Sequence, residues 1–452
     1  MPFWMYVYGC AATLIVTFAI LASFTIDSSA YKTGRTRPIV KSVVIANRWW
    51  LTLSRIGALT CLLLTIVSGF IGNPDPNRNI GMILFWVIFV LGLAYLTLFV
   101  GDIYSLVNPW RVAVRWMERQ GIDLSTPRLK YPQHFAFWIA YFFYVALIWI
   151  ELYARPSPLV LSVALTVYSL STLAGVVLFG KDEWFCHAEL FSVFFNLIGK
   201  LAPIEYREAK GIEESWQVRR RVPLSGALND RPPHISLVFF VLFMLSSTTY
   251  DGIQGTAFWI GLFWRNALTL FEPLWGTDMA RAQATLTGWY IVYRQGGLII
   301  FPFLYMIAYL LALRFMRALT GKSIGVRALV LSFCYSLLPI AVAYNFTHYF
   351  TMLIMSGGQL RWLVSDPFGI GWNLLSLKPV YKQQLTLQMG VVWHTEVAVL
   401  LAGHVASVYM AHIVATKTFS RRRQVIISQL PVLLLMVLYT TLGLTILSLP
   451  LG

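Results

Sequence analysis

The sequence has few charged residues for its length. Lysine, arginine, aspartate and glutamate make up 12% of the 452 residues, about half of the ~25% that is usual in soluble domains. Hydrophobic residues make up 58%. A chain with so little polar surface cannot cover itself in water, so its composition excludes an ordinary soluble globular protein and favours an integral membrane protein.

Cysteines and recognisable catalytic motifs are also scarce. The four cysteines form no CxxC or zinc-like spacing, and three of them lie inside apolar runs, so we expect no disulfide framework. The chain has no GxSxG, HExxH or Walker motif, and no GxGxxG after a strand. It also lacks a nucleic-acid-binding motif. The net charge of +16 therefore does not indicate a nucleic-acid partner, because the cations fall between apolar runs.

Apolar runs of about 20 residues recur along the chain. Each matches the ~30 Å hydrocarbon core of a bilayer at 1.5 Å per helical residue. They predict an all-α fold, a polytopic integral membrane helical bundle of about ten transmembrane helices. We find no repeat and no separate soluble insert, so residues 1–452 are expected to form a single transmembrane domain in the lipid bilayer. The predicted spans are 3–24, 50–72, 80–101, 134–154, 159–180, 235–251, 298–317, 328–352, 387–412 and 424–449.

The distribution of lysine and arginine predicts the orientation of these spans. One alternating set of loops holds 26 of these cations and the other set holds 8. Because cations resist translocation, the first set should be cytoplasmic and both termini should face outward. The N-terminal run has no basic region or A-x-A site, so it predicts a first span and not a cleaved signal peptide. The cation-rich loops are 25–49, 102–133, 181–234, 314–327 and 413–423.

Three amphipathic segments predict interfacial helices on both faces of the membrane. Residues 183–203 carry Glu183, His187 and Glu189, and residues 254–272 carry Arg265 near their middle. A charge at the bilayer centre costs at least about 2.5 kcal/mol. We therefore expect 183–203 and the basic helix 108–119 on the cytoplasmic face, and 254–272 on the outer face.

Ionisable residues inside the spans are the candidate functional residues. His348 and His394 are expected about 6 and 10 Å below the outer ends of their helices, and His404 lies about 15 Å deeper than His394. Asp251 is expected near the same outer level, with Glu396 and Asp366 as further carboxylates.

Imidazole and carboxylate groups expected at a similar depth in neighbouring helices have several interpretations. Asp251, His348, His394 and His404 are candidate ligands for a transition metal, with iron, copper and zinc fitting about equally. Facing histidines suit a haem b as well. The same histidines also suit interhelical hydrogen bonds or a path for protons or substrate.

A second candidate group is Cys186 with its neighbours His187 and Glu189. Consecutive helical residues point about 100° apart, so Cys186 and His187 should not face each other as a nucleophile and base would. We expect this segment to present a solvated interfacial face.

Several motifs resemble a bacterial family of multi-spanning membrane proteins commonly labelled "fenitrothion hydrolase". The resemblance covers most of the chain and implies metal-assisted hydrolysis of a phosphotriester in the bacterial inner membrane. It implies functional positions at Asp251, His394 and His404, with His187 and Glu189 as motif positions of unknown role. The motifs are NPWR (108–111), the segment 183–203, TTYDG (248–252), SDPFGIGWNL (365–374) and WHTEVAVLLAGHVASVYMAH (393–412).

Three functions therefore remain open from the sequence. The first is a membrane enzyme or redox subunit with a metal or haem near the outer face. The second is a transporter or permease, although the sequence lacks the paired broken helices of an inverted repeat. The third is a membrane anchor whose basic inner loops or interfacial helices dock a partner subunit at the cytoplasmic or outer face.

Overall fold

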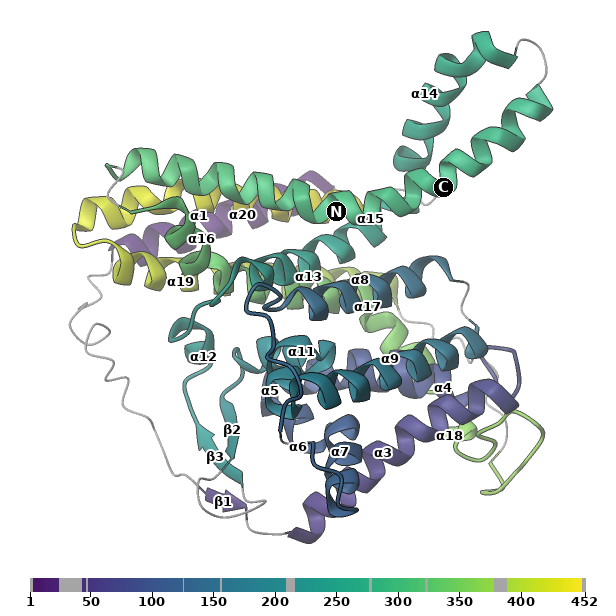
Figure 1. Cartoon of the computed structure of the whole chain (residues 1–452). Helices are drawn as coiled ribbons and strands as arrows, with labels where there is room; N and C mark the ends of the chain where they lie inside the picture. The colour runs from purple at the N-terminus through teal and green to yellow at the C-terminus, as the bar shows by residue number, and fades with distance from the viewer. Residues whose placement is uncertain are drawn as a thin grey trace. The chain divides into compact units, whose positions relative to one another are not determined.

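Figure 1 shows the computed structural model of the chain, which is almost entirely helical within the residues described. The predicted all-α fold class is therefore confirmed. Most of the cation-rich loop 25–49 and the last part of the loop after residue 353 lie outside the described residues. The structure describes residues 3–23, 43–45, 48–124, 126–154, 157–208, 216–275, 279–321, 324–377 and 388–448.

Nine helices in the described chain are long and apolar enough to cross a membrane. They coincide with nine of the ten predicted spans, so the chain is a multi-pass membrane protein. The remaining predicted span, 134–154, is helix α8 (Trp138–Tyr153), which has 16 residues. That length is short of the roughly 20 residues that cross a bilayer without tilt, so this crossing stays a prediction.

The chain divides into two compact units that interleave along the sequence. Both contain candidate membrane spans, so the division does not separate a soluble part from a membrane part. A single transmembrane domain over 1–452 stays a prediction. Unit 1 comprises Met1–Ser29, Val238–His348 and Trp393–Gly452, and unit 2 comprises Ala30–Leu237 and Tyr349–Val392.

Unit 1 is a bundle of long helices in which α15 and α1 both pack on α20. The buried residues of α1 recur every three or four positions, at Val7, Cys10, Leu14 and Phe18, which is one face of a helix. The opposite face, for example Tyr8, is left exposed. The helices of unit 1 are α1 (Phe3–Ser23), α13 (Ile235–Gln254, from Val238), α14 (Ala257–Trp275), α15 (Met279–Leu319), α16 (Val326–Phe333), η3 (Cys334–Leu337), α17 (Leu338–Gly357, as far as His348), α19 (Met389–Thr418, from Trp393) and α20 (Arg422–Ser448).

Helix α15 is 41 residues long and begins well before the predicted span 298–317. Its N-terminal part pairs with α14 in a helical hairpin (Figure 1). Aromatic rings join the two helices, with Trp259 and Tyr293 stacked at 4.8 Å between ring centroids. The sequence therefore predicted the α14 helix correctly and missed the continuation of α15 beside it.

Glycines allow close helix packing in unit 1. A Cβ atom at Gly403 of α19 would lie 2.4 Å from the Ala343 Cβ of α17, and one at Gly297 of α15 would lie 2.5 Å from the Tyr250 ring of α13. Small residues are favoured at such crossings, because helices in lipid associate by close van der Waals contact.

Unit 2 is built around the short helix α11, which packs against α5, α6, α8 and η2. Two π-helical segments, η1 and η2, also lie in this unit; π-helical turns are rare and frequently mark functional sites. The elements of unit 2 are β1 (Val43–Ile45), α3 (Arg48–Ile71), α4 (Ile80–Met82), η1 (Ile83–Gly92), α5 (Leu93–Val100), α6 (Tyr104–Val107), α7 (Pro109–Arg119), α8, α9 (Pro158–Phe179), α10 (Lys181–Glu183), η2 (Trp184–Ala188), α11 (Leu190–Gly199), β2 (Ile204–Glu208), β3 (Trp216–Arg220), α12 (Ser225–Leu228) and α18 (Leu360–Leu363).

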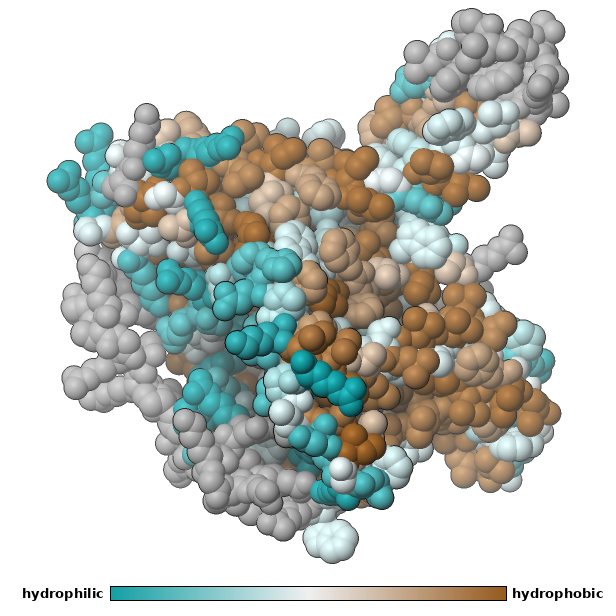
Figure 2. Space-filling view, in the orientation of Figure 1, coloured by the Kyte–Doolittle hydropathy of each residue, from teal (hydrophilic) through white to brown (hydrophobic). Residues whose placement is uncertain are grey.

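A small antiparallel sheet, which the sequence analysis did not predict, joins distant parts of unit 2. Its strand order is β1-β3-β2, with Val44 opposite Gln217 and Tyr206 opposite Val218. In Figure 2, hydrophilic side chains gather around β2, β3 and α12. Apolar side chains instead cover much of the long-helix surface, and Leu170 on α9, for example, is 63% exposed. This division is expected of a protein that contacts lipid along its helices and water at its loops.

Contacts between loops agree with the predicted alternation of sides within each unit. Asn73 donates to the Gly369 carbonyl (3.0 Å), which joins two predicted outer loops. Lys181 pairs with Glu118 (2.7 Å), which joins two predicted inner loops of unit 2. In unit 1, Gln424 beside one inner loop donates to the Thr320 carbonyl of another (3.0 Å). Loops assigned to the same side therefore meet, while the choice of inside and outside stays a prediction.

Candidate functional site: a carboxylate–imidazole pair in the membrane helices

The closest contact between predicted site residues joins α13 to α17 in unit 1. His348 Nε2 lies 2.7 Å from Asp251 Oδ2. The two side chains are partly buried, with 26% and 18% of their surfaces exposed. Asp251 stands in the last turn of α13, one residue before Gly252, where a Cβ would approach Ile446 of α20 to 2.8 Å. The absence of a side chain at Gly252 thus allows α20 to pack beside the pair.

Polar groups from neighbouring helices extend this pair. Gln254 Nε2 donates to Asp251 Oδ1 (3.0 Å), and Arg294 Nη2 of α15 lies 3.4 Å from Gln254 Oε1. Glu396 of α19 is close enough for its carboxylate to interact electrostatically with the His348 imidazole. Asp251, His348 and Glu396 therefore form an ionisable cluster on three membrane helices, which we call the carboxylate–imidazole cluster.

This arrangement is suited to holding a proton. A carboxylate that accepts a hydrogen bond from one imidazole nitrogen fixes the tautomer of the ring and stabilises its cationic form. A second carboxylate nearby favours a bound proton further, because opposite charges attract strongly where water is scarce. The partial exposure of His348 leaves the ring accessible for proton exchange.

No protein-family model, curated protein or solved structure matches this chain.

The other predicted site histidines have separate environments. His394 is exposed, and its Nε2 lies 3.3 Å from the Tyr6 hydroxyl of α1. His404 is fully buried; its Nδ1 lies 2.8 Å from the Leu400 carbonyl, and its Nε2 has no hydrogen-bond partner among the described residues. His412 is buried with its Nδ1 3.0 Å from Gln429 Oε1.

The described residues contain no group of three or more histidine, cysteine, aspartate or glutamate side chains that could hold a metal ion. Asp251 and His348 supply two donors, whereas His404 donates to its own helix. The predicted metal or haem site at Asp251, His348, His394 and His404 therefore finds no support in the described part of the chain.

Asp366, the other predicted outer carboxylate, shapes its own loop in unit 2. It is buried and accepts hydrogen bonds from the backbone N–H groups of Ile370 (3.1 Å) and Gly371 (2.8 Å). Gly369 and Gly371 have φ angles of +65° and +98°, which favour glycine. The SDPFGIGWN motif is thus explained by the conformation of this loop.

Glu189 lies in an environment that the sequence did not predict. A solvated face was predicted for its segment, but Glu189 is fully buried in unit 2, so the prediction was wrong at this position. It follows the π-helical turn η2 and caps α11, accepting from the backbone N–H groups of Phe191 (3.1 Å) and Ser192 (2.8 Å).

Four side-chain hydrogen bonds complete the surroundings of Glu189. Its carboxylate accepts from the hydroxyls of Tyr168 (2.5 Å), Ser192 (2.5 Å) and Tyr104 (3.3 Å), and from Asn108 Nδ2 (3.1 Å). A buried carboxylate is tolerated only where donors replace its water, and here both oxygens are satisfied. We interpret Glu189 as the centre that ties α6, α7, α9 and α11 together. Two motifs, NPWR (108–111) and the segment 183–203, meet at this point, and their polar residues were the signal in the sequence.

Proposed function

We propose that this multi-pass membrane protein is a proton-coupled carrier whose carboxylate–imidazole cluster binds the proton. The observation that supports this proposal is the 2.7 Å contact between Asp251 and His348 on two candidate membrane spans, with Glu396 acting on the same imidazole. Ionisable groups within membrane helices cost several kcal/mol and usually mark proton or substrate paths. A pair of neutral amides would link the two helices at a lower free-energy cost of membrane insertion. The presence of ionisable groups at this position therefore favours a role in proton binding.

The carrier proposal is tested by measuring proton flux directly. Purified protein is reconstituted in liposomes that contain a pH-sensitive dye, and an acid pulse with a potassium diffusion potential drives proton entry. We expect Asp251→Asn to lower the protein-dependent proton flux at least about ten-fold, because the amide cannot hold the imidazolium. His412→Asn is the control, since it removes a buried ionisable side chain of unit 1 that lies outside the cluster and is bonded to Gln429.

Two results would contradict the proposal. One is wild-type proton flux in Asp251→Asn liposomes with equal protein content. The other is an equal loss of flux in His412→Asn, which would show that removal of any buried polar side chain in unit 1 has the same effect. Infrared titration provides an independent readout, because the carboxylate band that shifts as His348 gains its proton should be lost in Asp251→Asn even where transport is slow.

A second candidate function uses the same pair as a general base. The family resemblance implies phosphotriester hydrolysis, and an imidazole oriented by a carboxylate and 26% exposed is suited to activating water. His348 would accept a proton from water as the oxygen bonds to phosphorus and the aryloxide leaves. Since the described residues offer no three-ligand metal group, hydrolysis of a chromogenic phosphotriester should persist with chelator and be lost in His348→Gln. Hydrolysis that needs added zinc would instead favour a metal enzyme.

A further inference from the structure

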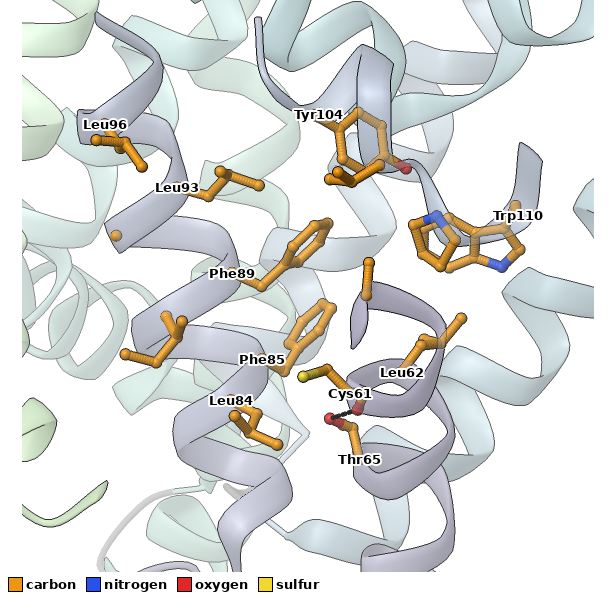
Figure 3. A pocket seen from close by; sticks show the side chains of 15 residues that line it. Cys61, Leu62, Thr65, Leu84, Phe85, Phe89, Leu93, Leu96, Tyr104 and Trp110 are labelled. Carbon is orange, nitrogen blue, oxygen red and sulfur yellow. Dashed lines mark hydrogen bonds between the residues drawn. The ribbon is translucent and has the colours of Figure 1, made fainter. Parts of the chain in front are cut away.

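Unit 2 contains an apolar cavity of about 290 Å³ between α3, η1, α5, α6 and α7. Figure 3 shows Cys61, Phe85, Phe89 and Leu93 around it, with Tyr104 and Trp110 at one end. Leu96 lines the cavity and is also 47% exposed, so the cavity opens on the lipid-facing surface. An opening of this kind admits an alkyl chain from the bilayer.

The polar groups at the cavity wall are already satisfied. The Tyr104 hydroxyl donates to Glu189, Trp110 Nε1 donates to Ser169 (2.9 Å), and Thr65 donates to the Cys61 carbonyl (2.8 Å). A wall without free hydrogen-bonding groups holds water poorly, because a buried water needs two to four polar partners. The cavity is therefore suited to an apolar occupant.

A second, polar pocket of about 610 Å³ lies in the same unit, on the side with the cation-rich loops. Four cationic side chains line it, and three carboxylates offset them in part. Lys200 pairs with Asp230 at 2.6 Å. The lining charged residues are Arg111, Lys200, Arg207, Arg221, Asp102, Glu205 and Asp230.

Arg111 and Arg207 are the cations best placed for a ligand. Arg111 lines the pocket, and its guanidinium lies over the Phe185 ring at 4.8 Å. Arg207 bonds Glu205 at 2.9 Å and keeps 57% of its side chain exposed. The single carboxylate of Glu205 also meets Arg221 at 3.5 Å, so it is shared between two guanidinium groups. The pocket thus retains donors for an anion.

One short stretch of chain separates the two cavities. Ser105 and Arg111 face the polar pocket, whereas Tyr104, Val107 and Trp110 face the apolar cavity. Neighbouring helical residues point about 100° apart, which places the walls of both cavities on α6 and the first turn of α7. The NPWR motif therefore contributes to both walls.

We propose that the apolar cavity and the polar pocket together bind a membrane amphiphile with an acyl chain and a phosphate headgroup. The chain enters the cavity beside Phe89 and Leu93, and the phosphate is bound by Arg111 and Arg207. Guanidinium groups match phosphate oxygens in geometry and charge, which favours a phosphate over a carboxylate headgroup.

The test uses native mass spectrometry of the full chain in an uncharged detergent. Phosphatidylglycerol supplies both features, phosphatidylcholine of the same chains neutralises the phosphate with a choline, and glycerol phosphate supplies the headgroup alone. We expect one phosphatidylglycerol to bind at least about ten-fold more tightly than either of the other two. A water-soluble phosphate that bound equally well would overturn the role of the apolar cavity.

Variants separate the headgroup from the chain. Arg207→Gln, on an exposed side chain, should weaken phosphatidylglycerol binding several-fold, whereas Arg119→Gln on the exposed end of α7 should not. Ala58→Trp fills the apolar cavity and should abolish binding, and Leu63→Trp, at a 53% exposed position of the same helix, should preserve it.

Each variant is first compared with the wild-type chain by size-exclusion chromatography. If Arg207→Gln and Arg119→Gln reduce binding equally, or if lipid adducts rise with concentration without saturation, the lipid lies only around the helices. Either outcome overturns the proposal.

Discussion

Replacement of Glu189 should be among the most destabilising single changes in unit 2. Its carboxylate accepts six hydrogen bonds and is fully buried. In Glu189→Ala, hydroxyl groups can rotate to other acceptors and Asn108 Nδ2 keeps its bond to Ser192 Oγ (3.2 Å), but the backbone N–H groups of Phe191 and Ser192 lose their only acceptor. Leaving each of these two donors unsatisfied costs about 1–3 kcal/mol, so we expect the free energy of unfolding to fall by at least about 2 kcal/mol.

Glu189→Gln should cost less because the amide keeps one oxygen acceptor. The amide nitrogen fits best at the position of Oε1, which accepts from Tyr168 and Phe191 in the wild type. The Tyr168 hydroxyl can rotate and accept a hydrogen bond from this nitrogen. The Phe191 N–H cannot rotate, so it alone would face another donor. That single unsatisfied N–H costs about 1–3 kcal/mol. The order of stability should therefore be wild type, then Glu189→Gln, then Glu189→Ala.

The matched control is Glu183→Ala, six residues earlier on the same segment. The Glu183 side chain is 56% exposed and pairs with His187 at 3.1 Å. An exposed pair of this kind contributes about 0–1 kcal/mol. The free energy of unfolding is compared by SDS titration in mixed micelles, followed by tryptophan fluorescence. If Glu189→Ala unfolds within about 1 kcal/mol of Glu183→Ala, the account of Glu189 as a structural centre is wrong.

Three further predictions concern packing, charge and polarity. Gly69→Ala should destabilise unit 2 by about 1–3 kcal/mol, since the new Cβ would lie 1.9 Å from Ser162 Oγ. Gly57→Ala is the control. Its Cβ would have nothing within 4 Å, so it should be neutral or stabilising in the same SDS titration. Burial raises the pKa of Asp102 to about 6, and protonation removes a negative charge from the polar pocket. Phosphatidylglycerol binding, measured by mass spectrometry, should therefore strengthen as pH falls from 7.5 to 5.5. The same pH dependence in Asp102→Asn would contradict this. His404→Leu should retain or raise thermal stability, because the buried Nε2 has no partner within the described chain; a large loss in a thermal melt would show that Nε2 is bonded as well.

Much of the fold follows from the length of the apolar runs. Nine predicted spans match long apolar helices because an uninterrupted apolar helix of this length has few other stable environments. The alternation of spans also placed the loops of Asn73 and Gly369 on one side, and these loops are in contact, whereas the inside and outside assigned from the charge count stay a prediction. The start of α15 could not be predicted, because Arg294 and its polar neighbours suggested a loop where tertiary packing with α14 maintains a helix.

The candidate site was predicted in part. Helical rise predicted a similar depth for His348 and His394, with Asp251 near the same outer level, and the structure joins His348 to Asp251. Depth does not determine the direction in which a side chain points, so the environments of His394 and His404 could not be derived. The burial of Glu189 was missed because its partners, such as Tyr104 and Tyr168, are distant in sequence and come together only in the folded unit.

The packing of α1 on α20 has a consequence for biosynthesis. The two helices are separated by about 400 residues of chain, which a ribosome needs roughly 20–80 s to synthesise. During that interval α1 rests in the membrane with its Leu14 face turned toward lipid or a chaperone. Insertion and final assembly are thus separate events for this helix, and the bundle is completed only when the late helix arrives.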